Sequence, residues 1–459
     1  MLIRNIFLSV VLLIFPTVAF SNPWMPTPKE IRYFEGTTNV GSRSQLVAPE
    51  ALRSRYKAAV DNFEVAVKSL PNPGTARITV TIGKPKDRAL MKTESYKVSI
   101  SSNGVVIEAG DYLGALHGLT FVESLIKGNA GRVRNQIVTD WPDHKIRALH
   151  LVIRGLRPEE IKEQITLARL ERFNYLILLL KDNVRLRGTE KFASADAWTE
   201  AELVDVVRFS RENGLEVVPQ LHLLTHQERF LGNAFPNVMY NQRTSDPRKE
   251  ETYRIILPII DEVIRLVKPR AFHIGHDEVA WFSSRKVKQP GQKGWRMRLG
   301  AGEAMLPPEL FLSSVKRLHD HLRSRGVETW MWGDMLIAPE EFPTMLARHL
   351  HARGGYSRIR GSIPKDIVIC DWHYFDSQPE FPSALAFAKA GHKVMGATWT
   401  QKTTIDNFSR YISGIGGEGM IATTWFPALK YKGLDKNSLY EIIKVSGEAF
   451  WNAKQQKGN

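Results

Sequence analysis

The chain contains very little cysteine. Cys370 is the single cysteine among 459 residues, so no disulfide can form within the chain. Small exported domains often depend on disulfides, but a chain of this length can bury enough apolar surface to fold without them. Because Cys370 ends the apolar run 367–370, we expect its thiol to be buried and unreactive.

Long apolar runs are also scarce. The only candidate begins with the arginine-containing segment 1–5, continues through the apolar run 6–15, and is followed by small residues near Ala19 and Ser21. This order is typical of an export signal, and the apolar run is short for a bilayer span. We therefore expect a signal peptide at 1–21, a periplasmic or secreted protein, and no stable membrane span after signal removal. An uncleaved membrane anchor is the alternative.

Acidic residues are outnumbered by basic ones. Lysine and arginine total 63 against 48 aspartates and glutamates, which gives a formal net charge of +15. A basic surface concentrates anionic partners. Because the chain carries no recognised nucleic-acid motif, we expect no nucleic-acid partner and consider an anionic glycan or cell-wall polymer instead. A basic surface that is merely solvated is the alternative.

The first part of the chain, residues 22–140, has the pattern of a small α+β accessory domain. Its apolar residues alternate or run in strand fashion in two segments, and Asp111 is suited to cap a following helix. We expect strands at 96–101 and 104–109 and helices at 49–70 and 111–128.

The second part, residues 141–459, alternates between strand and helix patterns, which predicts a (β/α)8 TIM barrel. No glycine-rich phosphate loop follows an early strand, which argues against a doubly wound dinucleotide-binding sheet. The segment 349–364 has the composition of a loop where the fifth helix would stand. The expected strands are 149–153, 175–180, 216–223, 271–275, 329–332, 367–371, 393–399 and 420–425, and the expected helices are 159–173, 200–213, 251–267, 309–325, 383–390, 405–412 and 438–451.

Polar and aromatic residues follow the apolar part of most of these strands. In a TIM barrel the carboxyl ends of the strands form one mouth, where the active site lies. We expect the following groups to converge there: Lys181-Asp182-Asn183, Gln220 to His226, His273 to Glu278, Trp332-Gly-Asp334, Asp371 to Asp376, Trp399 and Trp425.

The adjacent acids Asp277 and Glu278 are the sharpest signal. Neighbouring strand residues normally face opposite sides, but a bend at the strand end would turn both carboxylates into the mouth. When two carboxyl groups are held close together, repulsion between their charges raises the pKa of one of them. That carboxyl group is then suited to act as a general acid beside its ionised partner. Two surface acids at the start of a loop would be the structural alternative.

The segment His273-Ile-Gly-His-Asp277-Glu278 resembles the His-x-Gly-x-Asp-Glu motif of glycoside hydrolase family 20, the β-N-acetylhexosaminidases. Residues 96–127 resemble that family's accessory domain, and 140–147 resemble its entry into the barrel. The resemblance implies a retaining mechanism in which the substrate's own 2-acetamido oxygen attacks the anomeric carbon, with no cofactor and no metal.

The resemblance also implies roles for particular residues. Glu278 would protonate the leaving oxygen and then activate water, while Asp277 would hold the acetamido N–H. Tyr374 resembles the tyrosine that donates to the acetamido oxygen, and His226 resembles a histidine that orients the acid. The aromatic walls of the sugar pocket would be Trp332, Trp399 and Trp425.

The chain departs from the family pattern where the terminal sugar is clamped. Arg154 is near the position of the family's arginine but one place out of register, and no acid follows the last strand. His222 and Gln220 stand where the family has Asp and Glu. Asp182 remains a candidate substrate contact, and Lys181, Arg185 and Arg187 would meet either an anionic sugar or only solvent.

Two other functions remain open on sequence grounds. His222, His226, His273 and His276 would suit a zinc-dependent barrel hydrolase, although the first strand lacks a His-x-His pair. The chain could also be a glycan-binding relative that has lost catalysis along with the clamp.

Overall fold

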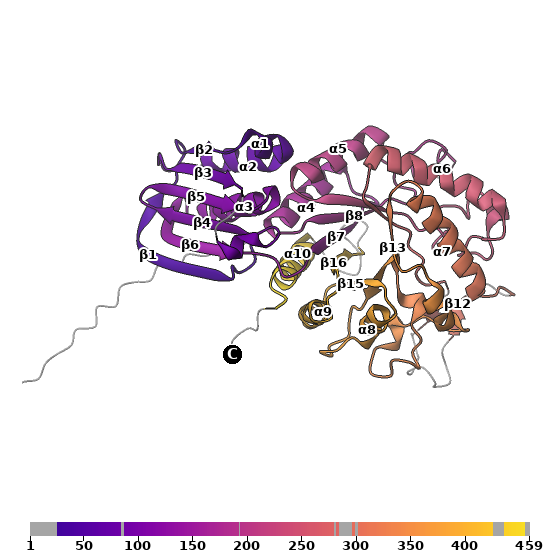
Figure 1. Ribbon diagram of the computed structural model, residues 1–459. Coiled ribbons are helices and arrows are strands. Elements are labelled where there is room, and N and C mark those ends of the chain that lie inside the picture. The colour runs from indigo at the N-terminus through magenta and orange to yellow at the C-terminus, as the bar shows by residue number, and fades with distance from the viewer. Residues whose placement is uncertain are drawn as a thin grey trace, which may run out of the picture.

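The computed structural model describes residues 25–83, 87–191, 193–279, 281–283, 296–298, 302–425 and 436–454. An N-terminal sheet and a closed barrel lie side by side in it (Figure 1). The expected signal peptide at 1–21 lies outside these residues. Among the residues that are described, no helix is long and apolar enough to cross a membrane.

The N-terminal sheet has six strands in the order β1-β6-β4-β5-β3-β2. Both predicted strands are confirmed, and Asp111 caps α3 by accepting a 2.7 Å hydrogen bond from the N–H of Gly114. The prediction of one helix at 49–70 is wrong, because Tyr56, whose ring is buried, adopts a non-helical conformation that separates α1 from α2. The elements are β1 (Glu30–Asn39), β2 (Gln45–Val47), α1 (Glu50–Arg55), α2 (Lys57–Lys68), β3 (Arg77–Ile82), β4 (Tyr96–Ser101), β5 (Gly104–Ala109), α3 (Tyr112–Gly128) and β6 (Arg132–Asp140).

Eight parallel strands close the barrel in the order β10-β13-β14-β15-β16-β7-β8-β9, which confirms the predicted (β/α)8 fold. Each of the eight predicted strand segments overlaps one of them. They are β7 (Ile146–Val152), β8 (Tyr175–Leu179), β9 (Glu216–Gln220), β10 (Ala271–His273), β13 (Glu328–Trp332), β14 (Val368–Trp372), β15 (Lys393–Thr398) and β16 (Gly419–Thr424); a short hairpin, β11 (Trp281–Ser283) and β12 (Arg296–Arg298), follows β10. Cys370 is buried on β14, as predicted, and burial raises the pKa of its thiol.

Helices follow seven of the eight barrel strands. Between β13 and β14 the chain forms only short 3-10 turns, at Asp334–Leu336, Ala347–His349 and Tyr356–Ser362, as the loop-like composition of 349–364 predicts. The helices are α4 (Pro158–Leu170), α5 (Glu200–Glu212), α6 (Glu250–Val267), α7 (Pro308–Arg323), α8 (Pro382–Lys389), α9 (Lys402–Gly414) and α10 (Lys436–Trp451).

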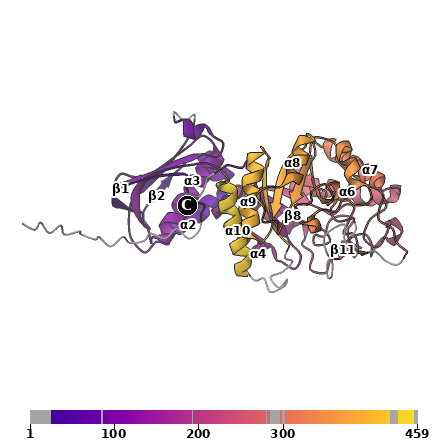
Figure 2. The ribbon, with the colours of Figure 1, turned by 90° about the horizontal axis from the view of Figure 1, so that it is seen from below.

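Buried polar contacts fasten the N-terminal sheet to the barrel. Figures 1 and 2 show α10 at the side of the barrel that faces this sheet. The indole N–H of Trp451, at the end of α10, lies 3.0 Å from Asp140 at the end of β6. Glu94 pairs with Arg147 of β7, and although burial opposes ionisation, the charge of Arg147 holds the pKa of Glu94 at about 2. The two units therefore share an ordered interface.

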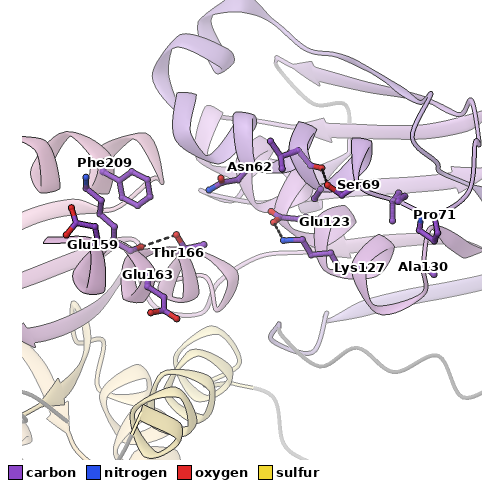
Figure 3. A pocket seen from close by; sticks show the side chains of 14 residues that line it. Asn62, Ser69, Pro71, Glu123, Lys127, Ala130, Glu159, Glu163, Thr166 and Phe209 are labelled. Carbon is purple, nitrogen blue, oxygen red and sulfur yellow. Dashed lines mark hydrogen bonds and ion pairs between the residues drawn. The ribbon is translucent and has the colours of Figure 1, made fainter. Parts of the chain in front are cut away.

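A cavity of about 890 Å³ lies between α2 and α3 on one side and α4 and α5 on the other (Figure 3). Its walls include the apolar side chains of Val65, Leu70 and Phe209 and the ion pair between Glu123 and Lys127. None of the predicted site residues lines this cavity, so the site must be sought at the barrel mouth.

Candidate active site

The backbone bends sharply where β10 ends. Gly275, His276 and Glu278 have φ values of 77°, 68° and 45°, in the left-handed region. Gly275 is required here, because a Cβ would lie 2.8 Å from the ring of His222. The bend brings both acids to one side chain: Nε2 of His226 is 3.2 Å from Oδ2 of Asp277 and 3.5 Å from Oε2 of Glu278. The structure therefore gathers the three residues at one point, as predicted.

Asp277 is buried and ionised. Burial alone would raise its pKa, but its contacts with His226 and His222 outweigh burial and hold the pKa of Asp277 well below its usual range. Its other oxygen, Oδ1, has no hydrogen-bonding partner among the described residues. A buried carboxylate with a free lone pair is suited to accept a hydrogen bond from a ligand.

Side chains hold both backbone groups of Glu278. Its N–H donates to Oδ2 of Asp334 at 2.9 Å, and its carbonyl accepts from Nε of Arg243 at 3.1 Å. Its side chain is partly exposed, in contrast to that of Asp277. We call the group His226, Arg243, Asp277, Glu278, Asp334 and His351 the acid side of the mouth.

The buried pair Asp334 and His351 completes the acid side. Nε2 of His351 donates its proton to the carbonyl of Arg348 at 2.8 Å. The other ring nitrogen, Nδ1, lies 2.8 Å from Oδ2 of Asp334, and a second proton lies in this contact, shared between the ring and the carboxylate. Burial would lower the pKa of His351, but the hydrogen bond to Asp334 outweighs it and raises that pKa. The pair thus holds one proton directly behind the backbone of Glu278.

The four predicted aromatic residues form one group at the ends of β13, β14, β15 and β16. The Tyr374 hydroxyl accepts a 2.8 Å hydrogen bond from the indole N–H of Trp425, and burial raises the pKa of Tyr374. The ring of Trp399 is 5.7 Å from that of Tyr374, and the ring of Trp332 is 5.9 Å from that of Trp425. Trp332 is 0% exposed, so it supports the wall from within the barrel.

The remaining predicted contacts stand at the ends of β7 and β8. Nη2 of Arg154 is 3.6 Å from Oδ2 of Asp182. Lys181, with a left-handed φ of 44°, has no hydrogen bond or ion pair with another described residue, although its charge helps to lower the pKa of the buried His222. We call Arg154, Lys181 and Asp182 the clamp side of the mouth.

The four histidines considered for zinc do not form one cluster. The rings of His222 and His226 are 4.6 Å apart, but His273 packs on Trp332, and His276 bonds to Ser314 at 3.1 Å. Among the described residues, two other sets have ligand atoms close enough to hold an ion: His226, Asp277 and Glu278, and the buried set His349, His373 and Asp376.

Neither set suits a metal ion well. Arg243 places a guanidinium 2.8 Å from His226, and its positive charge opposes a cation in the first set. In the second set, Asp376 already accepts hydrogen bonds from both histidines, at 2.6 and 2.9 Å. Burial would lower the pKa of His373, but Asp371 and Asp376 outweigh it and raise that pKa to about 9. The second set is therefore an internal ion cluster.

Sequence reasoning placed Asp334 at the mouth, because it follows the fifth barrel strand directly, but gave it no role. It did not single out Arg243 or His351. Arg243 and His351 stand in connections without regular secondary structure at those positions, where no periodicity marks a residue that points inward.

Comparisons with known proteins agree with this arrangement. Residues 23–141 match the family model described as glycosyl hydrolase family 20, domain 2, and residues 178–400 match the catalytic domain of the same family. A lacto-N-biosidase of Bifidobacterium bifidum is 21% identical over 381 residues, which cover 79% of this chain and 31% of that protein. Beta-hexosaminidase A of Caenorhabditis elegans is 22% identical over 249 residues, 46% of this chain and 44% of that protein. The chain thus spans less than half the length of these curated relatives.

Solved structures show the same fold. A beta-N-acetylhexosaminidase from Bacteroides fragilis superposes with a TM-score of 0.70 at 17% identity, covering 94% of this chain and 91% of that one. A chitobiase from Flavobacterium johnsoniae gives 0.69 at 18% identity, covering 94% and 69%. Together, the two family models account for both units described above, and the chain therefore belongs to glycosyl hydrolase family 20.

Proposed function

We propose that this chain is a glycosidase that cleaves β-linked N-acetylglucosamine or N-acetylgalactosamine from glycans by a retaining, substrate-assisted mechanism. The observation that carries the proposal is the pairing of a buried, ionised Asp277 with a partly exposed Glu278 around His226. The names of the relatives, lacto-N-biosidase and beta-hexosaminidase, support the same substrate class.

In the first step the 2-acetamido oxygen of the substrate forms a bond to the anomeric carbon, and the glycosidic bond breaks. Glu278 gives its proton to the leaving oxygen. Asp277 accepts a hydrogen bond from the acetamido N–H, and its negative charge stabilises the oxazolinium that forms. The free Oδ1 lone pair of Asp277 is suited to this role.

In the second step water attacks the anomeric carbon and the bond to the acetamido oxygen breaks. Glu278, now a carboxylate, takes the proton of that water and returns to its starting state. Tyr374 would donate its hydroxyl proton to the acetamido oxygen, because the oxygen of that hydroxyl already accepts from Trp425. Trp399 and Trp425, which are only partly buried, would form the walls that hold the acetamido group in attack position.

The clamp side would hold the hydroxyls of the terminal sugar. Lys181 offers an ammonium that has no hydrogen bond or ion pair with another described residue, and Arg154 and Asp182 offer a donor and an acceptor beside it. Arg185 and Arg187 are exposed and would meet an acidic substituent only on a larger glycan.

We also propose that the protein is exported, on the strength of the signal-like segment at 1–21. Cell fractionation and N-terminal sequencing of the mature protein test this proposal. A mature chain that starts at Met1 and remains with the cytosolic fraction would contradict it.

Turnover of paired substrates tests the function. An aryl N-acetyl-β-hexosaminide should be hydrolysed, while the matching glycoside with a plain 2-hydroxyl should not, because it lacks the internal nucleophile. No turnover of either substrate, with N-acetylhexosamine still bound, would instead support a glycan-binding protein. Activity lost on exhaustive chelation and restored by zinc would support the metal-dependent alternative.

A further inference from the structure

Arg243 is a buried side chain, in the connection between β9 and α6, that contacts several members of the acid side. Its Nε donates to the carbonyl of Glu278 at 3.1 Å, and its Nη2 lies 2.8 Å from Nδ1 of His226. The same Nη2 is 3.5 Å from Oε2 of Glu278, and Nη1 donates to Oε1 of Glu228 at 3.1 Å. One guanidinium therefore contacts the backbone and the carboxylate of Glu278 and the histidine beside it.

The guanidinium of Arg243 also lies against the ring of His226. Its Nη2 is 2.8 Å from Nδ1 and 3.2 Å from Nε2 of that ring. Nε2 in turn lies 3.2 Å from the carboxylate of Asp277 and 3.5 Å from that of Glu278. Arg243 therefore holds in place the ring that contacts both acids.

The contact with the carbonyl determines where Glu278 stands. A non-glycine residue with φ of 45° is strained and stays in this conformation only when its surroundings hold it there. The N–H of Glu278 is held by Asp334 and the carbonyl by Arg243, so each side of the strained residue is fixed by one side chain. Loss of Arg243 would release the carbonyl and let the carboxyl group leave the mouth.

We propose that Arg243 is the positioning residue that holds the carboxyl group of Glu278 in the mouth for proton donation, by fixing the His226 ring and the left-handed backbone of Glu278. This inference rests on the proposed glycosidase function. It adds a requirement that the Asp-Glu motif alone does not state, because Arg243 lies 35 residues before Glu278 in the sequence.

The test compares the kcat of the Arg243→Gln variant on a substrate with a poor leaving group and on one with a good leaving group. An aryl N-acetyl-β-glucosaminide with a poor leaving group, such as phenyl, needs the proton of Glu278, whereas a 2,4-dinitrophenyl glycoside needs little protonation. We expect kcat to fall at least about 100-fold on the phenyl substrate and less than about tenfold on the dinitrophenyl substrate, since general acid catalysis contributes about 10²–10⁴. Arg229→Gln, an exposed arginine in the same connection, should change neither rate.

Two further variants keep the test decisive if Arg243→Gln does not fold. Arg243→Lys retains the charge but cannot form all the contacts, so it should show the same selectivity with a smaller loss. Arg243→Ala should regain phenyl-substrate activity in millimolar guanidinium. The inference would be overturned by equal losses on both substrates in every folded variant, or by no loss in any of them. Turnover by the wild type would in that case leave the proposed function intact. A wild-type chain without turnover would instead defeat the proposed function.

Discussion

The two sides of the barrel mouth are built in different ways. On the acid side, hydrogen bonds within the protein connect Arg243 to Glu278, Glu278 to Asp334 and Asp334 to His351, while Oδ1 of Asp277 has no such partner among the described residues. On the clamp side Arg154 approaches Asp182 only to 3.6 Å, and Lys181 has no such partner among the described residues. Arg154 is also 34% exposed.

This difference separates two tasks. Bond cleavage requires groups that are fixed before the substrate arrives, because charge develops at defined atoms in the transition state. Sugar recognition instead requires donors and acceptors that are left for the substrate to satisfy. The acid side therefore fits the general chemistry of the family, while the clamp side is where the specificity of this chain should differ.

The largest expected effect is on the acid side. Glu278→Gln keeps the shape of the side chain but cannot donate a proton, so turnover of a substrate with a poor leaving group should fall by about 10²–10⁴-fold. Steady-state kinetics on a phenyl N-acetyl-β-hexosaminide measures this loss. Turnover near that of the wild type would show that the acid lies elsewhere in the mouth.

Acid should destabilise the fold through His276, which precedes Asp277 in the sequence but does not belong to the acid side. Burial lowers the pKa of His276 to about 4, against about 6.5 in the unfolded chain. The unfolded state therefore binds more protons as the pH falls below 6.5, and this group alone should remove up to about 3 kcal/mol of unfolding free energy by pH 4. Urea unfolding at pH 7, 6 and 5 should show a shallower decline for His276→Gln than for the wild type. Parallel declines would mean that His276 does not titrate in this way.

A smaller effect is expected on the clamp side. Lys181→Met removes donors for the sugar hydroxyls, so KM should rise by about tenfold while kcat changes little, because a hydrogen bond to a charged group contributes about 1.5–3 kcal/mol. Lys191→Met, an exposed lysine in the same connection, is the matched control and should leave KM unchanged. A loss confined to kcat would instead assign Lys181 to the acid side, through its charge on Asp277.

The smallest effect should come from the exposed arginines. Arg185→Gln and Arg187→Gln should alter hydrolysis of a neutral aryl glycoside by less than about twofold, because exposed charges act weakly through solvent. The same variants, assayed on a sulfated or uronate-containing glycan at low salt, distinguish an anionic substrate from a merely solvated basic surface. A salt-dependent loss on the acidic glycan alone would favour an anionic substrate.

The barrel was predictable because each strand is a short apolar run and seven of the eight are followed by a helical pattern, as 175–180 is by 200–213. The rule that the active site of a TIM barrel lies at the carboxyl ends of its strands also predicted that Asp277, Glu278, His226 and Tyr374 would lie at one mouth. The break of the first helix at Tyr56 was not predictable, because the residues on both sides have similar helix propensity. Arg243 was missed because a side chain in an irregular connection is placed by tertiary contacts and not by periodicity. The left-handed conformation of Glu278 was missed for the same reason.

The central claim is that the substrate supplies the nucleophile beside Asp277 and Glu278, and fluorination of the acetyl group tests it most directly. Each added fluorine weakens the attacking oxygen, so kcat/KM on aryl glycosides should fall stepwise from N-acetyl through mono-, di- and trifluoroacetyl. The same decline should appear in single-turnover experiments, where bond cleavage is measured alone. A rate indifferent to fluorination while cleavage limits turnover, or a trapped covalent glycosyl-enzyme, would contradict the account.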